Sequence, residues 1–150
     1  MKLTVLTTIL LVLPLKVISC PLAGYWKSDE EKTLASFRQV IGATQKQKEV
    51  FEDNFFGNLY IHIECEKLTS VMDDWMETKD YELVSFTDES VIISYASILE
   101  GVVTLEATIE NDCYFIDVMG GQFKEYFCPV SADAYSGAIK LAQEAMRDDQ

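Results

Sequence analysis

Residues 62–66 hold the side chains whose types and spacing come nearest to a reactive site. The segment reads HIECE, and His62 is the only histidine in the 150-residue chain. Apolar and polar residues alternate here, which predicts a strand, and residues three apart on a strand point to opposite faces. His62 and Cys65 therefore cannot share a metal ion, whereas His62, Glu64 and Glu66 lie on one face. Because no second ligand cluster accompanies them, we interpret that face as solvated and predict neither a metal site nor a cofactor.

Nucleophilic catalysis is not indicated either. No motif places a serine or cysteine beside His62, and the sequence contains no G-x-S-x-G and no glycine-rich phosphate-binding loop. Neighbouring acidic residues occur in a turn, at a helix start and in the C-terminal tail, where solvation and the helix dipole account for them; they are Asp73-Asp74, Asp29-Glu30-Glu31 and Asp148-Asp149. We therefore expect no catalytic residues and a protein that is not an enzyme.

The first nineteen residues have the composition of a secretory signal peptide. Lys2 supplies a basic start, residues 3–15 form an apolar run, and Ser19 is a small residue before the expected cleavage point. The run is shorter than the roughly 20 apolar residues that a membrane-spanning helix needs. We expect residues 1–19 to be removed and residues 20–150 to form one exported domain.

The charge of the chain is strongly negative. Its formal net charge is −13, and it becomes −15 when Lys2 and Lys16 leave with the signal peptide. An acidic surface disfavours nucleic acid and unaided binding to anionic membranes, and it permits cationic partners. Charge also keeps an exported protein in solution, which is the simpler explanation.

Cleavage after residue 19 would make Cys20 the first residue. Residues 17–20, VISC, resemble the bacterial lipobox, whose cysteine receives a lipid, so we expect lipidation of Cys20 and an anchor on the periplasmic side of the cell envelope. The alternative is ordinary cleavage and secretion, with Cys20 in a disulfide. If Cys113 pairs with Cys128, Cys65 is left free, or it pairs with Cys20 when Cys20 is not lipidated. Pairing of Cys65 with Cys113 or Cys128 also stays open.

Residues 102–128 predict a three-stranded antiparallel meander. Apolar and polar residues alternate from Val103 to Glu110, and Asn111-Asp112 and Gly120-Gly121 are hairpin signals. Tight turns there set the register, and the facing pairs would be Asp117 with Lys124, Val118 with Phe123, Tyr114 with Phe127, Cys113 with Cys128, and Leu105, Ala107 and Ile109 with Val118, Ile116 and Tyr114. One face is then apolar, with Glu125 its single exception.

A disulfide between Cys113 and Cys128 follows from this register, on one condition. A strict two-residue turn makes them a hydrogen-bonded pair, whereas a four-residue loop over 119–122 makes them the closer, non-hydrogen-bonded pair, which suits a disulfide better.

The remaining elements complete an α+β fold. Capping boxes at Ser28–Glu31 and Thr44–Gln47 predict two helices, the first reaching about Ile41 and the second ending at Gly57, which form a hairpin with an aromatic inner face. Strands are expected over 59–65, 68–72, 81–86 and 91–97, and Ser131 should cap a final amphipathic helix. The expected architecture is an antiparallel meander of six to seven strands, in a strongly bent sheet or small barrel, with helices at both ends.

Gly24-Tyr25-Trp26 matches the G-x-W signature of the lipocalins, just after the signal peptide. The final helix also resembles the helix that lipocalins pack outside the barrel, and residues 24–128 resemble small bacterial envelope lipoproteins described as lipocalin-like. The chain departs from lipocalins in three ways: helices follow Trp26, no Thr-Asp-Tyr run occurs, and no arginine lies near the last strand. The resemblance implies a small lipocalin-like barrel in which Trp26 is a core plug.

The expected function is therefore that of a non-enzymatic, extracytoplasmic protein that binds a small apolar ligand. The alternative is an acidic protein-interaction module, an inhibitor or assembly factor, for a cationic partner. No ligand-binding residue is assigned from sequence; the aromatic residues that could line a cavity are Phe51, Phe55, Phe56, Tyr60, Phe86, Tyr95, Tyr114, Phe115, Phe123, Tyr126 and Phe127.

Overall fold

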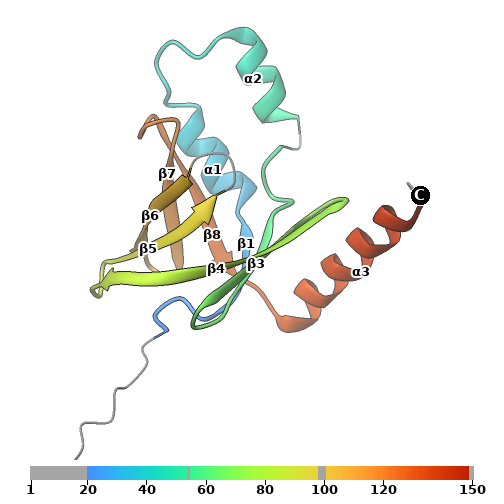
Figure 1. The fold of residues 1–150 in the computed structure, drawn as a ribbon. Coiled ribbons are helices and arrows are strands. Elements are labelled where there is room, and N and C mark those ends of the chain that lie inside the picture. Colours follow the sequence, from blue (N-terminus) through green and yellow to red (C-terminus); the bar gives the residue numbers. More distant parts are fainter. Residues whose placement is uncertain (1–19, 54, 98–100, 149–150) are drawn as a thin grey trace, which may run out of the picture.

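The strands of this protein close into a single barrel (Figure 1). The computed structural model describes residues 20–53, 55–97 and 101–148. Each strand pairs antiparallel with the next, and the last strand pairs with the first. In chain order the elements are β1 Gly24–Ser28, α1 Glu30–Phe37, α2 Gln45–Glu52, β2 Tyr60–Ile63, β3 Lys67–Met72, β4 Trp75–Phe86, β5 Ser90–Ser97, β6 Gly101–Glu110, β7 Cys113–Val118, β8 Phe123–Pro129 and α3 Ala132–Asp148.

The predicted meander is confirmed around both turns. Across β7 and β8 the partners are Asp117 with Lys124, Val118 with Phe123, and Tyr114 with Phe127. The connection between these strands is the four-residue loop 119–122, in which three successive residues have positive φ. The two glycines of that loop accept this backbone without a Cβ penalty.

The β6–β7 register is also as predicted, but the ladder is shorter than expected. Ile109 pairs with Tyr114 and Ala107 pairs with Ile116, where the ladder ends, so the expected pairing of Leu105 with Val118 is not made. On its other edge β6 pairs with β5 over residues 101–108, where Leu105 faces Ile93. Strands β6 and β7 therefore diverge from Ala107 toward the start of β6.

The described part of the chain holds eight strands where the sequence predicts six to seven. The additional strand is β1, which pairs with β2 on one side and β8 on the other. Ser28 is the last residue of β1 and not a helix cap; the α1 N-cap is Asp29, whose carboxylate accepts a hydrogen bond from the Lys32 amide at 2.9 Å. The predicted Ser28–Glu31 capping box is therefore wrong, and α1 ends at Phe37, well before Ile41.

Helices α1 and α2 form the predicted hairpin at one end of the barrel (Figure 1). The capping box of Thr44 and Gln47 is confirmed at the start of α2, although α2 ends at Glu52 and not at Gly57. The aromatic inner face is also present: the Phe37 ring meets Phe51 at 4.8 Å and Phe123 of β8 at 5.4 Å. The helical hairpin thus caps the barrel with aromatic rings.

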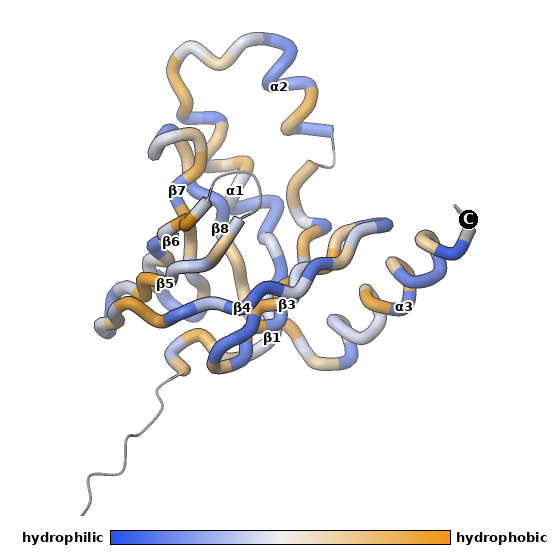
Figure 2. Tube along the Cα trace, viewed as in Figure 1, coloured by the Kyte–Doolittle hydropathy of each residue, from blue (hydrophilic) through white to orange (hydrophobic). Residues whose placement is uncertain are grey.

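Helix α3 lies outside the barrel, against the outer face of β2 and β3 (Figure 1). Its apolar stripe packs as predicted, with Tyr135 and Ala142 buried against Val71. Ser131 caps the helix by accepting a hydrogen bond from the Ala134 amide at 3.2 Å. Figure 2 shows hydrophobic and hydrophilic residues alternating along α3, as expected of a helix with one packed side.

Two disulfides tie the fold together. Cys113 is bonded to Cys128, as the β7–β8 register and the four-residue loop predict. Cys20 is bonded to Cys65, which is the alternative pairing that the sequence leaves open. A sulfur in a disulfide cannot also carry the thioether of a lipid, so this disulfide and the expected lipidation of Cys20 are mutually exclusive. The expected signal peptide, residues 1–19, lies outside the described residues.

Disulfides persist in oxidising compartments, which agrees with a protein located outside the cytoplasm. Within the described ranges, no helix is long and apolar enough to cross a membrane.

Candidate functional site

The one histidine is part of the contact between the barrel and α3. The His62 ring stacks on Tyr25 at 4.4 Å and lies 5.5 Å from Tyr135 of α3. Of the face interpreted as solvated, Glu64 and Glu66 are exposed, whereas His62 is half-buried against α3. Across residues 20–53, 55–97 and 101–148, no group of three or more His, Cys, Asp or Glu side chains is arranged to bind a metal ion.

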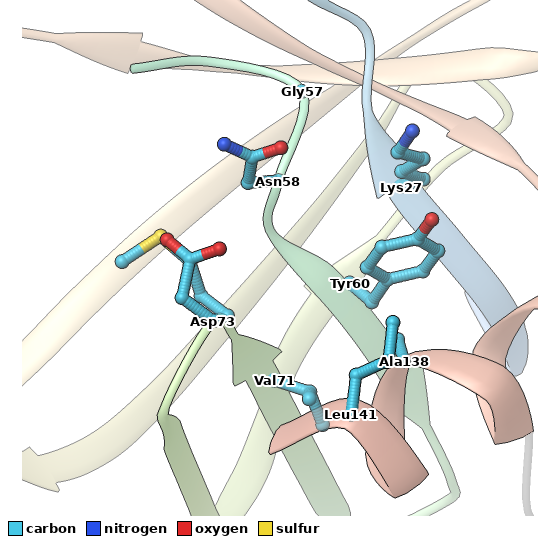
Figure 3. Close-up of a pocket in the computed structure, with 9 residues that line it drawn as sticks. Lys27, Gly57, Asn58, Tyr60, Val71, Asp73, Ala138 and Leu141 are labelled. Atoms are coloured by element: carbon cyan, nitrogen blue, oxygen red, sulfur yellow. The ribbon is translucent and has the colours of Figure 1, made fainter. Parts of the chain in front are cut away.

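A first cavity, of about 200 Å³, lies outside the barrel between α3 and the strands that it covers (Figure 3). Tyr60 forms one side, with the Lys27 ammonium 5.2 Å from the centre of its ring. Leu141 forms part of the opposite side and is 68% exposed, and Asp73 at the rim is exposed as well. This site is therefore a surface groove with mixed polar and apolar walls.

A second cavity, of about 220 Å³, lies inside the barrel. Strands β2 to β8 all contribute to its wall, because every second residue of a barrel strand points inward. The wall is apolar except for Ser70, Lys79 and Glu125. A concave, mostly apolar space with a few polar groups is the usual form of a small-molecule site, so we take the interior cavity as the candidate site.

Trp26 helps to close this cavity at the Leu22 end. Its indole Nε1 donates a 2.9 Å hydrogen bond to the Leu22 carbonyl oxygen, and the buried Leu22 side chain lines the cavity. The Trp26 ring also meets Tyr114 edge-on at 4.9 Å. Trp26 therefore positions residues of the cavity wall without being part of that wall.

Two stacked aromatic rings form the part of the wall nearest to Trp26. Tyr114 of β7 and Phe127 of β8 are cross-strand partners, and their rings lie 5.1 Å apart at 17°. Both side chains are buried. Burial raises the pKa of the Tyr114 phenol, and the negative charge of Glu125 raises it further. Tyr114 therefore stays neutral across the physiological range.

Glu125 is the acidic group of the cavity, and a defined chain of hydrogen bonds holds it. Ser28 of β1 donates to Oε1 of Glu125 at 2.9 Å, and the same serine oxygen accepts from the Gly57 amide at 3.3 Å. Since the Ser28 oxygen already accepts one bond, its proton is directed toward Glu125. Gly57 has φ of +87°, and a Cβ there would lie 3.0 Å from Glu30, so only glycine brings its amide this close.

The surroundings of Glu125 disfavour its charged form. Burial raises the pKa of this carboxyl group, and the hydrogen bond from Ser28 opposes that rise only in part. Removing water from around the carboxylate destabilises its charged form by more than a single hydrogen bond from a hydroxyl stabilises it. Glu125 is thus an acid that sits in an apolar cavity with a proton affinity above that of ordinary glutamates.

Lys79 of β4 is the basic group of the cavity, and its charge is already balanced. Its ammonium lies 3.0 Å from Oε2 of Glu77, its neighbour but one on the same strand. It also lies 5.3 Å from the centre of the Tyr95 ring. The Lys79 side chain is 31% exposed, so this ion pair is in partial contact with solvent.

The sequence located only part of this wall. Of the eleven aromatic candidates, Tyr95, Tyr114 and Phe127 line the cavity. Phe51, Phe56 and Phe123 pack instead between the barrel and its helices, and Phe86 is exposed. Lys79 was missed because the charged residues before Tyr81 hid the first half of β4.

Glu125 is the residue for which the sequence carried a signal. It is the single acidic residue on a strand face that is predicted to be apolar, and the sequence alone shows this exception. Comparisons with protein-family models, with curated proteins and with solved structures find no match for this chain. The cavity and its chemistry are therefore the basis on which a function is assigned.

Proposed function

We propose that this chain is an exported, non-enzymatic binding protein that holds a small, largely apolar molecule inside its barrel. The observation that supports this most directly is the interior cavity of about 220 Å³ with its apolar wall. Barrels of about eight strands are either filled by side chains or hold one small ligand, and here side chains leave a space. The G-x-W segment in β1 adds a lipocalin-like feature to the proposal.

The cavity volume sets the size of the molecule. An apolar cavity of about 150 Å³ accommodates benzene, so a cavity of about 220 Å³ holds about nine non-hydrogen atoms. That size corresponds to one substituted aromatic ring or a short alkyl chain. Long fatty acids exceed it, and we expect fluorescent long-chain fatty-acid probes to bind more weakly than small aromatic molecules.

Tryptophan fluorescence gives a direct test with propylbenzene, which has nine non-hydrogen atoms. Trp26 contacts the ring of Tyr114, which lines the cavity. Trp75, by contrast, lies on the barrel exterior and is 42% exposed. The chain has two tryptophans, so in a Trp75→Phe variant the tryptophan fluorescence comes from Trp26 alone. We expect a saturable change in its emission on titration with propylbenzene, and a flat signal would contradict the proposal.

A matched pair of variants separates the interior cavity from the outer groove. Ala107 is buried and lines the interior, so Ala107→Leu fills the cavity and should abolish binding. Ala138 lines the groove of Figure 3, and Ala138→Leu should leave binding unchanged. Loss of binding in the Ala138 variant alone would move the site to the groove.

The alternative function, a module for a cationic protein partner, has the net charge of −13 in its favour. Attraction through an acidic surface weakens as salt rises, whereas transfer of an apolar molecule into a cavity does not. A protein-interaction module without a ligand in its barrel would bind no propylbenzene at any salt concentration, whereas we expect binding with an affinity that is unchanged or stronger at high salt.

A further inference from the structure

We propose that the molecule bound in the barrel carries a positively charged amine, and that Glu125 is the group that recognises it. This inference rests on the proposed function, because it names the ligand class of the same cavity. It starts from the two ionisable side chains of the cavity wall, Glu125 and Lys79. Either could recognise a charged ligand, and their surroundings decide between them.

Lys79 already has a counter-charge. The Glu77 carboxylate lies 3.0 Å from its ammonium, and the centre of the Tyr95 ring lies 5.3 Å from it. An anionic ligand would have to compete with Glu77 for this group. A carboxylic acid ligand is therefore disfavoured at Lys79.

Glu125 has no counter-charge among the described residues. Its one hydrogen-bond partner there is the neutral hydroxyl of Ser28, which reaches a single oxygen, Oε1. A carboxylate can accept about four hydrogen bonds, so most of its capacity is open to a ligand inside the cavity. Burying a charge without a partner is costly, and an ammonium group from the ligand removes that cost.

The neighbouring rings favour the same class of ligand. Tyr114 and Phe127 stack beside Glu125 in the wall, and the face of an aromatic ring attracts cations. A buried carboxylate beside this aromatic stack binds an ammonium group better than it binds a neutral or anionic one. The negative field of the whole chain, with a net charge of −13, also attracts cations and repels anions.

The size of the cavity completes the description of the ligand. An amine of about nine non-hydrogen atoms consists of one ring or a short chain and a terminal ammonium group. Such a molecule would place its apolar body against the aliphatic wall. Its ammonium group would lie at Glu125.

Three probes of nearly equal size test this on the wild-type protein: 2-phenylethylamine, its neutral counterpart 2-phenylethanol, and the anion phenylacetate. We expect 2-phenylethylamine to bind more tightly than phenylacetate. We also expect Glu125→Gln, which keeps the shape and a hydrogen-bond acceptor for Ser28, to weaken the amine about tenfold to a hundredfold. The affinity for 2-phenylethanol should stay within about threefold of wild type, since it makes only a neutral hydrogen bond.

Glu106→Gln is the matched control, because it makes the same change at an exposed carboxylate of β6 that is not part of the cavity wall, and it should not weaken the amine. Tighter binding of phenylacetate than of the amine by the wild type overturns the inference, and this ranking needs no variant to fold. An amine affinity that is unchanged in Glu125→Gln overturns it as well. If either result is found while propylbenzene binds, only the amine inference is rejected and the proposed function stands. If none of the four molecules binds, the amine inference and the proposed function are both rejected.

Discussion

Ser28 donates a 2.9 Å hydrogen bond to Glu125 across 97 positions of sequence, and this bond joins the first and last strands of the barrel. The serine side chain is almost completely buried. The same hydroxyl accepts the Gly57 amide, so it links the barrel seam to the segment that leads from α2 into β2. One hydroxyl thus positions the acid of the cavity and fixes the closing strand.

Removal of this hydroxyl should destabilise the protein. Ser28→Ala leaves the Gly57 amide and the Glu125 carboxyl without their partner, and an unsatisfied buried polar group costs about 1–3 kcal/mol. Urea unfolding measures the loss of unfolding free energy. The control is Ser70→Ala, on the cavity wall, where we expect a change within about 0.5 kcal/mol. Equal losses in the two variants would contradict this role of Ser28.

The raised pKa of Glu125 predicts a pH dependence of stability. Above the ordinary carboxyl value of 4.5, the folded protein holds a proton that the unfolded chain has released. The stabilisation by this proton is complete below the pKa of Glu125 in the unfolded chain. It is lost as the pH rises through the pKa of Glu125 in the folded protein. When both proteins are measured at a series of pH values from about 4 to about 8, the wild type should lose stability relative to Glu125→Gln as the pH rises above the ordinary carboxyl value of 4.5.

Urea unfolding of both proteins across that range isolates the contribution of Glu125, because the other carboxyl groups are common to both. The charged groups that face it from the cavity wall are few, namely Lys79 with its partner Glu77, while Tyr114 is neutral in this range. A constant difference between the two proteins over the whole range would show that the pKa of Glu125 is ordinary.

The two disulfides should stabilise the protein by different amounts. Cys20 and Cys65 are 45 positions apart, and Cys113 and Cys128 are 15 apart. Since a crosslink removes more entropy from the unfolded chain when it closes a longer loop, we expect losses of about 4 and about 3 kcal/mol for the two paired Cys→Ala variants. Unfolding in urea without reductant measures both, and the reverse order would contradict a loop-entropy origin.

The mass of the purified protein should show Cys20 in a disulfide and not lipidated. We expect the intact mass of residues 20–150 less four hydrogens, one pair for each disulfide, with no lipid adduct. After reduction and alkylation, all four cysteines should react. A lipid-sized mass increase on Cys20 would restore the lipoprotein interpretation and leave Cys65 with a free thiol.

The meander shows where sequence reasoning succeeds. Alternation fixed the inner face of β6, β7 and β8, and the Asn111-Asp112 and Gly120-Gly121 turns fixed their register, because both signals act between neighbours in the chain. The same local logic found α3, its Ser131 cap and the start of α2. It also marked Glu125 as an acid on an apolar face.

The capping box at Ser28 shows where such reasoning fails. A serine followed by an acid three residues later is compatible with a helix start, and the local pattern contains nothing against it. The structure places Ser28 in a strand because its backbone pairs with β8 and its hydroxyl meets Glu125, which are contacts with residues about a hundred positions away.

Sequence alone determined the strand-rich character of the chain, its acidity, one disulfide and the oddity of Glu125, since these depend on composition and on neighbouring residues. Tertiary structure alone decided that β1 closes the barrel, that α3 covers His62, that Cys20 pairs with Cys65, and that Glu125 faces an unfilled cavity. The physical reason is that closure and cavity formation depend on how eight strands pack against one another, which no single segment encodes.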